Sequence, residues 1–146
     1  MSSGKRLPYE TTLLVRDCCL CLHVQRAARA LARRFDEVLR PFDLTNGQFS
    51  LLMSLNRPAP PPMGPVASLL AMDRTTLTAN LKPLERLGFV EVGVAEADRR
   101  RRVLELLPAG QAALVAAVPV WEQEHVALEK LVRDGDRLRR DLAALG

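Results

Sequence analysis

Four consecutive arginines, Arg99 to Arg102, follow Asp98 and stand between two short apolar runs. Like charges in a row repel one another, and phosphate groups relieve the repulsion when they neutralise the charges and release counterions. Arginine is also the side chain favoured in a narrow minor groove of DNA, where the negative potential is strongest. The stretch therefore favours nucleic-acid binding, with Asp98 as an internal counter-charge that pairs with Arg100. The alternative is a solvated basic turn.

A second chemical pattern lies in residues 73–88, which read DRTTLTANLKPLERLG. At 100° per residue, Leu77, Leu81 and Leu84 share one side of a helix and form a buried stripe. Such a helix can offer hydroxyls, small groups and cations to phosphates and base edges in a major groove, although a solvated helix face has a similar composition. The side chains opposite the leucine stripe are Thr75, Thr78, Ala79, Lys82 and Arg86.

Cys18, Cys19 and Cys21 lie within four residues, and His23 follows at helical spacing from Cys19. A structural zinc site normally takes four ligands from two well-separated pairs, and the sequence offers no second pair. We therefore expect neither a metal nor another cofactor, and we interpret His23 as a packed or hydrogen-bonded residue. The clustered cysteines form no disulfide framework, which indicates a reduced, cytoplasmic protein.

Local signals outline the scaffold that must position these residues. A capping box of Thr45 and Gln48 and an N-cap at Asp73 mark helix starts, and Gly88 marks a helix end. Two alternating, β-rich runs, 89–94 and 102–107, pair as a hairpin. The first predicted helix covers 11–40 and is ended by Pro41. Three further helices cover 45–56, 64–71, which begins with Gly64 and Pro65, and 74–87. A long helix runs from Pro108 to about Arg133 with a kink at Pro119, and a short last helix is capped by Asp134 or Asp136.

This order predicts a mainly α fold with a small β-hairpin wing, in which a winged helix-turn-helix is flanked by long terminal helices. We expect residues 1–146 to form one domain, with 45–107 as the DNA-binding part and 11–41 and 108–146 as dimerisation helices. The first helix, about 45 Å long at 1.5 Å per residue, cannot bury its apolar stripe against so few elements. A second copy of the chain is therefore expected to cover it, together with Val115, Val118, Trp121 and Leu128.

Composition and missing motifs exclude several classes of protein. The net charge of +4 is mild, but residues 98–102 carry four arginines and one aspartate, whereas residues 103–146 carry five basic and seven acidic side chains. No apolar run reaches the eighteen or so residues of a membrane span, and the first ten residues do not resemble a signal peptide. The sequence has no glycine-rich phosphate loop, Gly-x-Ser-x-Gly elbow or His-Glu-x-x-His motif, so we do not expect an enzyme.

The stretches LTNGQFSLL, MDRTTLTANLKPLERLGFVEV and DRRRRVLELLPAG, in this order and spacing, resemble the MarR family of bacterial winged-helix transcriptional regulators. The resemblance covers nearly the whole chain and implies an obligate homodimer that reads a palindromic operator in double-stranded DNA. It also implies that Asp98 braces the wing and that Arg100 enters the minor groove. Ala79 and Val92 stand where relatives often carry arginine, and Leu107 replaces a capping threonine. The expected DNA-binding residues are Arg74, Thr75, Thr76, Thr78, Lys82, Arg86, Asp98, Arg99, Arg100 and Arg101.

The resemblance further implies a repressor that a small aromatic or amphipathic ligand releases from DNA. The organic-hydroperoxide-sensing branch of the family instead carries a reactive cysteine, and Cys21, twenty-four residues before Thr45, occupies that position. Cys18 is its candidate resolving partner, while Gln25 and Phe35 stand where that branch has tyrosines. A redox-sensing repressor is therefore the alternative function. Further alternatives are an architectural protein that binds DNA without sequence preference and a winged protein-interaction module.

Overall fold

In the computed structural model, which describes residues 4–146, the side chains of Thr45, Asp73 and Asp134 cap the starts of three helices. Thr45 and Gln48 form the predicted capping box, in which the Gln48 N–H donates to the Thr45 hydroxyl and the Thr45 N–H donates to the Gln48 amide oxygen. Asp73 accepts the backbone N–H of Thr76 at 2.7 Å. Gly88 ends that helix with a left-handed φ of 71°, a conformation that costs glycine little.

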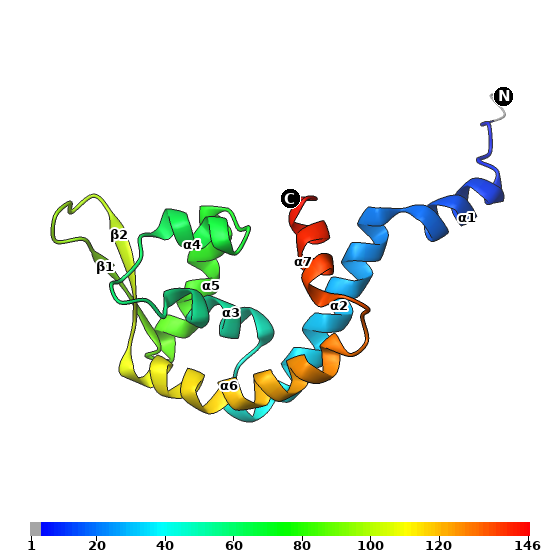
Figure 1. Ribbon diagram of the computed structural model, residues 1–146. Helices are drawn as coiled ribbons and strands as arrows, with labels where there is room; N and C mark the ends of the chain where they lie inside the picture. Colours follow the sequence, from blue (N-terminus) through cyan, green and yellow to red (C-terminus); the bar gives the residue numbers. More distant parts are fainter. Residues whose placement is uncertain (1–3) are drawn as a thin grey trace. The chain divides into compact units, whose positions relative to one another are not determined.

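The fold class is the predicted one, a mostly helical chain with a two-stranded antiparallel hairpin (Figure 1). Helix positions agree with the sequence signals to within a few residues at most ends. The elements are α1 (Tyr9–Cys18), α2 (Leu20–Leu39), the 3-10 turn η1 (Arg40–Phe42), α3 (Asn46–Leu55), α4 (Met63–Leu69), α5 (Arg74–Arg86), β1 (Val90–Val94), β2 (Arg102–Leu106), α6 (Pro108–Glu129) and α7 (Gly135–Ala143).

The chain divides into two parts, residues 1–34 and residues 35–146, which we call the N-terminal part and the main part. The prediction of one helix over 11–40 is wrong at Cys19, where an extended ψ of 109° separates α1 from α2. The Cys19 sulfur accepts the Leu22 N–H at 3.4 Å, and the Cys19 carbonyl oxygen lies 2.7 Å from Nδ1 of His23. These contacts satisfy polar groups at the start of α2, so a new helix begins there.

Other helix ends differ from the prediction by one to four residues. Helix α4 begins at Met63 with Pro62 as its N-cap, so Gly64 lies inside the first turn. Helix α6 ends at Glu129 rather than near Arg133, because the chain turns before Asp134 caps α7. The predicted consequence of Leu107 is confirmed, since α6 has no side-chain cap at that residue.

The hydrophobic core of the main part lies where α3, α5, the hairpin and the start of α6 meet. Val118 and Trp121 are partly buried against this core within their own chain. The Trp121 ring stacks on Phe49 with the ring centroids 5.9 Å apart. The largest fully buried side chains are Leu39, Leu51, Leu52, Leu55, Val66, Leu77, Leu81, Leu84 and Leu104.

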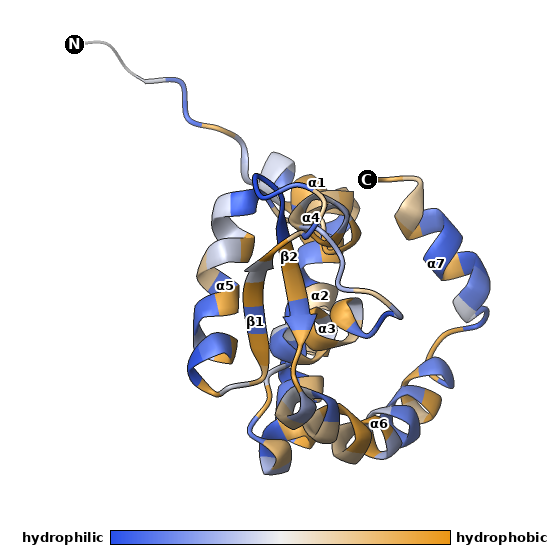
Figure 2. Ribbon diagram, turned by 90° about the vertical axis from the view of Figure 1, so that its left-hand side faces the viewer, coloured by the Kyte–Doolittle hydropathy of each residue, from blue (hydrophilic) through white to orange (hydrophobic). Residues whose placement is uncertain are grey.

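The wing, residues 90–106, consists of β1, β2 and the loop 95–101 between them. The strands pair in register from Val90 opposite Leu106 to Val94 opposite Arg102. Figure 2 shows hydrophobic stretches in the strands and a hydrophilic loop. The proline-rich connector is tied to the wing, because the Leu104 N–H donates to the carbonyl oxygen of Pro61 at 2.9 Å.

The base of the wing lies against the first turn of α6. The Leu107 N–H donates to the carbonyl oxygen of Phe89 at 2.9 Å. Gly110 approaches the same carbonyl so closely that a Cβ added to it would stand 2.4 Å from the oxygen. Only glycine fits at this position without a shift of backbone, so α6 and the start of β1 are held together.

Candidate nucleic-acid interface

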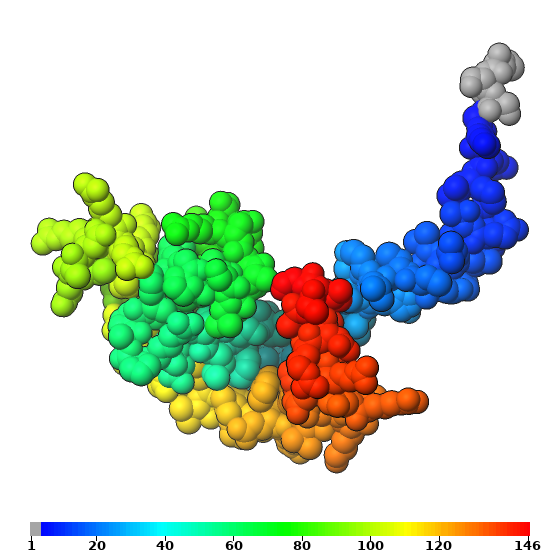
Figure 3. All heavy atoms as spheres, turned by 45° about the horizontal axis from the view of Figure 1, so that its top comes forward, coloured from blue at the N-terminus to red at the C-terminus, as the bar shows by residue number. Residues whose placement is uncertain are grey.

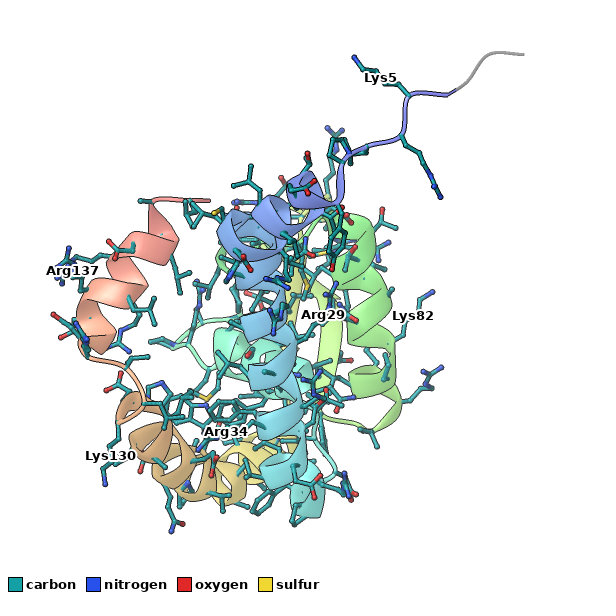
Figure 4. The ribbon with its side chains drawn as sticks, turned by 90° about the vertical axis from the view of Figure 1, so that its right-hand side faces the viewer. Lys5, Arg29, Arg34, Lys82, Lys130 and Arg137 are labelled. Atoms are coloured by element: carbon teal, nitrogen blue, oxygen red, sulfur yellow. The ribbon has the colours of Figure 1, made fainter. Side chains whose placement is uncertain are left out.

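Helix α5 turns one side to the core and the other to solvent. Leu77, Leu81 and Leu84 are at most 1% exposed, which confirms the predicted leucine stripe. Lys82 points away from the body of the main part (Figure 4). The exposed side chains that were predicted to face DNA are Arg74, Thr75, Thr76, Thr78, Lys82 and Arg86.

The first turn of α5 is held by its own side chains. The pKa of Asp73 is lowered mainly by the hydrogen bond from the Thr76 backbone N–H. The carboxylate that caps the helix therefore stays ionised. The Thr78 hydroxyl donates to the carbonyl oxygen of Arg74 at 2.8 Å. Its lone pairs and methyl group remain for an outside partner.

The wing loop is shaped by Asp98 in a way that differs from the predicted charge pair. Its carboxylate accepts the backbone N–H of Arg100 at 3.0 Å, and its carbonyl oxygen accepts the N–H of Arg101 at 3.0 Å. The Ala95 N–H closes the loop on the carbonyl oxygen of Arg101 at 2.9 Å. Within residues 4–146, Asp98 contacts the backbone of Arg100 and forms no ion pair with its guanidinium.

A hollow of about 270 Å³ lies between the wing, the start of α4 and the start of α5. We call it the arginine notch. It brings Arg74 together with Arg100 and Arg101, three of the predicted site residues, whereas Lys82 and Arg86 lie outside it. The wing stands out from the rest of the main part in the space-filling view (Figure 3). The notch is lined by Pro62, Met63, Gly64, Pro65, Arg74, Arg100, Arg101 and Arg102.

The sequence alone did not predict two features of the basic side chains. Arg102 and Gly64 line the notch, but the pairing that brings their segments together is not local in sequence. The basic surplus was also misplaced: residues 1–34 carry seven basic and two acidic side chains, whereas residues 35–146 carry fourteen and fifteen. The helical spacing of three arginines indicates this surplus, because it places Arg26, Arg29 and Arg33 on one face of α2.

The cysteine cluster lies at the break between α1 and α2. Cys18 and Cys21 are exposed, and Cys19 is half-buried. Gln25 donates its side-chain N–H to the sulfur of Cys21 at 3.2 Å, at the position where the resemblance implied a tyrosine. Among residues 4–146, no three His, Cys, Asp or Glu side chains gather as a metal site would need.

A second hollow, of about 540 Å³, opens between α3, the end of α4 and α6. We call it the apolar groove. Trp121 lies in its wall, stacked on Phe49 and, with ring centroids 4.7 Å apart, on His125. Its lining is largely apolar and consists of Phe49, Ser50, Met53, Ser54, Leu69, Leu70, Val118, Trp121 and Glu122.

The chain resembles transcriptional regulators of known structure. The M. tuberculosis transcriptional regulator MosR, solved in complex with DNA, is 40% identical over 87% of this chain and 92% of that one, with a TM-score of 0.80. A mutant MarR from E. coli complexed with operator DNA has the same fold, with 24% identity over 91% of this chain and 95% of that one and a TM-score of 0.76. These neighbours are regulators and not enzymes.

Sequence comparison alone gives a shorter match. The uncharacterized HTH-type transcriptional regulator YwoH of Bacillus subtilis (strain 168) is 31% identical over 83 residues, 57% of this chain. The match spans 60% of the length of that curated relative. No protein-family profile matches the sequence. None of the helices described for residues 4–146 has the length and apolarity that a membrane crossing requires.

Proposed function

Since this chain belongs to the MarR family of winged helix-turn-helix transcriptional regulators, we propose that it is a repressor that binds a palindromic operator as a homodimer. A small aromatic or amphipathic ligand releases it from DNA, and it acts in the cytoplasm. In this proposal residues 45–107 bind DNA, and residues 11–41 and 108–146 form the dimer.

The observation that carries this proposal is the exposed polar side of α5 beside an arginine-rich wing, both attached to the same hydrophobic core. Thr75, Thr76 and Thr78 suit base edges and phosphates, and Lys82 and Arg86 suit phosphates or guanine. Arg99 and Arg100 enter the minor groove next to the major groove that α5 occupies, because arginine is favoured there. The Asp98 carboxylate shapes the wing loop through the Arg100 backbone, which leaves the arginine side chains available to DNA.

Selection from a library of random duplexes tests the operator proposal. The full chain should enrich one palindrome whose half-sites lie about one helical turn apart, the spacing expected of a two-fold symmetric protein. Affinity for that duplex should fall steeply with salt, because phosphate contacts release counterions. Equal affinity for selected and random duplexes would instead support the architectural alternative.

The homodimer is supported by apolar side chains that neither part of the chain buries. Val24 and Leu31 of α2 are each 39% exposed, and Val115 of α6 is 65% exposed. Exposed apolar side chains gathered on one helix mark an interaction site in a folded protein. Further exposed apolar side chains on the proposed dimerisation helices are Leu14, Val15, Leu20, Val126, Leu138 and Leu142.

The apolar groove is the site that we propose for the ligand. Its aromatic wall and few polar groups suit a small aromatic molecule. Trp121 is the single tryptophan of the chain, so its fluorescence reports on the groove directly. A panel of aromatic carboxylates, benzoate and naphthoate among them, should include one that releases the selected duplex and changes Trp121 fluorescence over the same concentration range. Release without a change in fluorescence would place the ligand elsewhere.

The redox alternative is favoured by the exposure of Cys21 and by the Gln25 donor to its sulfur. In this mechanism the Cys21 thiolate attacks a hydroperoxide, and the products are a sulfenic acid and an alcohol. The Cys18 thiol then displaces water from the sulfenic acid to form a disulfide. Cys18 ends α1 and Cys21 lies in α2, so the disulfide would span the break between the helices.

Cumene hydroperoxide added to the complex with the selected duplex distinguishes the two triggers. Under the redox mechanism the wild-type chain releases DNA and gains a Cys18–Cys21 disulfide by mass spectrometry, whereas Cys21→Ser stays bound. If both proteins stay bound while an aromatic carboxylate releases them, Cys21 is not a sensor.

A further inference from the structure

The arginine notch gathers positive charge from two separate segments of the main part, the start of α5 and the consecutive residues 100–102. Arg74 is the first residue of α5, Arg100 and Arg101 belong to the wing loop, and Arg102 opens β2. No acidic side chain lines the hollow, and none of these arginines has an ion pair within residues 4–146. Because the four charges repel one another, an anion that enters from solvent stabilises the arrangement.

Backbone contacts hold the walls of the notch in place. The Pro61 carbonyl oxygen accepts the Leu104 N–H at 2.9 Å, and Pro62 forms a β-bridge with Val103, the neighbour of Arg102. The segment that begins α4 is thereby fastened to β2. The hollow is part of the fold of the main part and does not depend on the wing loop alone.

Gly64 has no side chain to fill the notch. A Cβ added at Gly64 would stand 3.6 Å from a terminal guanidinium nitrogen of Arg74. A longer side chain at this position would enter the space beside that guanidinium. The hollow of about 270 Å³ equals the volume of roughly nine liquid water molecules, which is ample for a tetrahedral anion.

We propose that Arg74 and Arg102 in the arginine notch bind one phosphoryl group, a contact separate from the minor-groove contact of Arg100 and from the base-reading side of α5. Guanidinium groups suit it because their parallel N–H donors match pairs of phosphate oxygens. One source of the phosphoryl group is a backbone phosphate of bound DNA, and for this source the inference rests on the proposed function. The other source is a free phosphoryl compound. A phosphate between Arg74 and Arg102 links the start of α5 to the start of β2 and fixes the wing relative to the helix.

Two glycines at equivalent helix positions provide a matched test. Gly64 and Gly47 are both the second residue of their helices, α4 and α3, and a Cβ on Gly47 meets nothing within 4 Å. Glutamate is favourable near a helix N-terminus, so both substitutions should keep or raise the melting temperature. Gly64→Glu places a carboxylate beside Arg74 and should weaken binding to the selected duplex about tenfold or more. Gly47→Glu, which adds the same charge, should weaken it much less, and equal losses would overturn the proposal.

Single methylphosphonate substitutions in the selected duplex identify the phosphate. Each removes one backbone charge, and at one position per half-site the loss of affinity should be large for the wild type and absent for Arg74→Gln. Arg74→Gln should also reduce the slope of log affinity against log salt by about one for each protomer. Arg6→Gln, a charge change ahead of α1 and outside the parts proposed to bind DNA or form the dimer, should keep the wild-type pattern at every position.

Inorganic pyrophosphate tests the free-anion source in the absence of DNA. It should raise the melting temperature of the wild type above that in sodium chloride of equal ionic strength, and Arg74→Gln should lose this increase. The site is assigned to free anions if pyrophosphate raises the melting temperature only when Arg74 is present and Arg74→Gln leaves the effect of every methylphosphonate unchanged. The notch proposal fails, and the proposed function stands, if Arg100→Ala weakens DNA binding but Arg74→Gln changes neither the methylphosphonate pattern nor the effect of pyrophosphate on the melting temperature. If no duplex is selected at all, the proposed function fails, and pyrophosphate alone decides the notch.

Discussion

Arg100 is the residue on which the minor-groove assignment depends, because its backbone is fixed by Asp98 while its guanidinium has no partner within the wing. Arg100→Ala should weaken binding to the selected duplex by about 1–3 kcal/mol, the scale of one lost specific contact. Fluorescence anisotropy of labelled duplex measures the change. Arg6→Ala, outside the parts proposed to bind DNA or form the dimer, is the control for the loss of one charge. An Arg100→Ala protein that stays folded and dimeric with unchanged affinity would remove Arg100 from the minor groove.

Asp36 couples the end of α2 to the start of α3 through two hydrogen bonds. Its carboxylate accepts the backbone N–H of Asn46 at 2.7 Å and the side-chain N–H of Asn46 at 2.8 Å, and the backbone contact is the main cause that lowers the pKa of Asp36. Because this pKa is lower in the folded chain than in the unfolded one, the ionised group stabilises the fold at neutral pH. The contribution is lost as the pH falls below about 4, through the folded pKa.

Asp36→Ala should therefore lower the free energy of unfolding at pH 7 by about 1 kcal/mol, and the difference from wild type should shrink at pH 3. Urea unfolding at the two pH values measures both quantities. Glu37→Ala is the control, since the ion pair of Glu37 with Arg40 at 2.6 Å is exposed and contributes little. A loss at pH 3 equal to that at pH 7 would show that packing, and not the ionised carboxylate, matters at Asp36.

At the scale of elements, the contact between α6 and the wing depends on one glycine. Gly110→Ala would place a Cβ 2.4 Å from the Phe89 carbonyl oxygen, which is backbone and cannot rotate away. The substitution should lower the free energy of unfolding by about 1–3 kcal/mol, the usual cost of overpacking. Thermal unfolding measures it, with Gly47→Ala as a control in open space, where alanine should stabilise the helix. A Gly110→Ala chain as stable as wild type would mean that α6 and the wing base are not rigidly joined.

Elements whose boundaries depend on neighbouring residues could be predicted from the sequence. The Thr45–Gln48 capping box and the Asp73 cap each join residues three positions apart, and both are confirmed. The break at Cys19 could not be predicted, because a sulfur rarely caps a helix and nothing near it interrupts the helical pattern. The arginine notch was only half predicted, since its arginines are visible in the sequence but the bridge from Pro62 to Val103 is a tertiary contact.

At the scale of the whole molecule, the exposed apolar surface should make the chain a dimer. Interfaces of obligate dimers bury on the order of 2,000–5,000 Å². A glutamate at Val126, which is 59% exposed on α6, should place an unpaired charge in that interface and shift the chain toward a monomer. Light scattering at micromolar concentration measures the change. Leu87→Glu, at a similarly exposed apolar residue outside the proposed dimerisation helices, should leave the dimer intact. A wild-type chain that is a folded monomer would contradict the dimer.

The uneven distribution of charge has a kinetic consequence. The main part, which carries the candidate DNA contacts, has nearly balanced charge, whereas the N-terminal part holds the positive surplus, with Arg26, Arg29 and Arg33 on one face of α2. Long-range attraction accelerates encounter, whereas short-range contacts set how long a complex lasts. Replacing the three arginines with glutamine should slow association at low salt several-fold and leave the dissociation rate nearly unchanged, as stopped-flow mixing would measure. Substitutions in the wing should do the reverse, so speed of search and duration of binding are set by different segments of one chain.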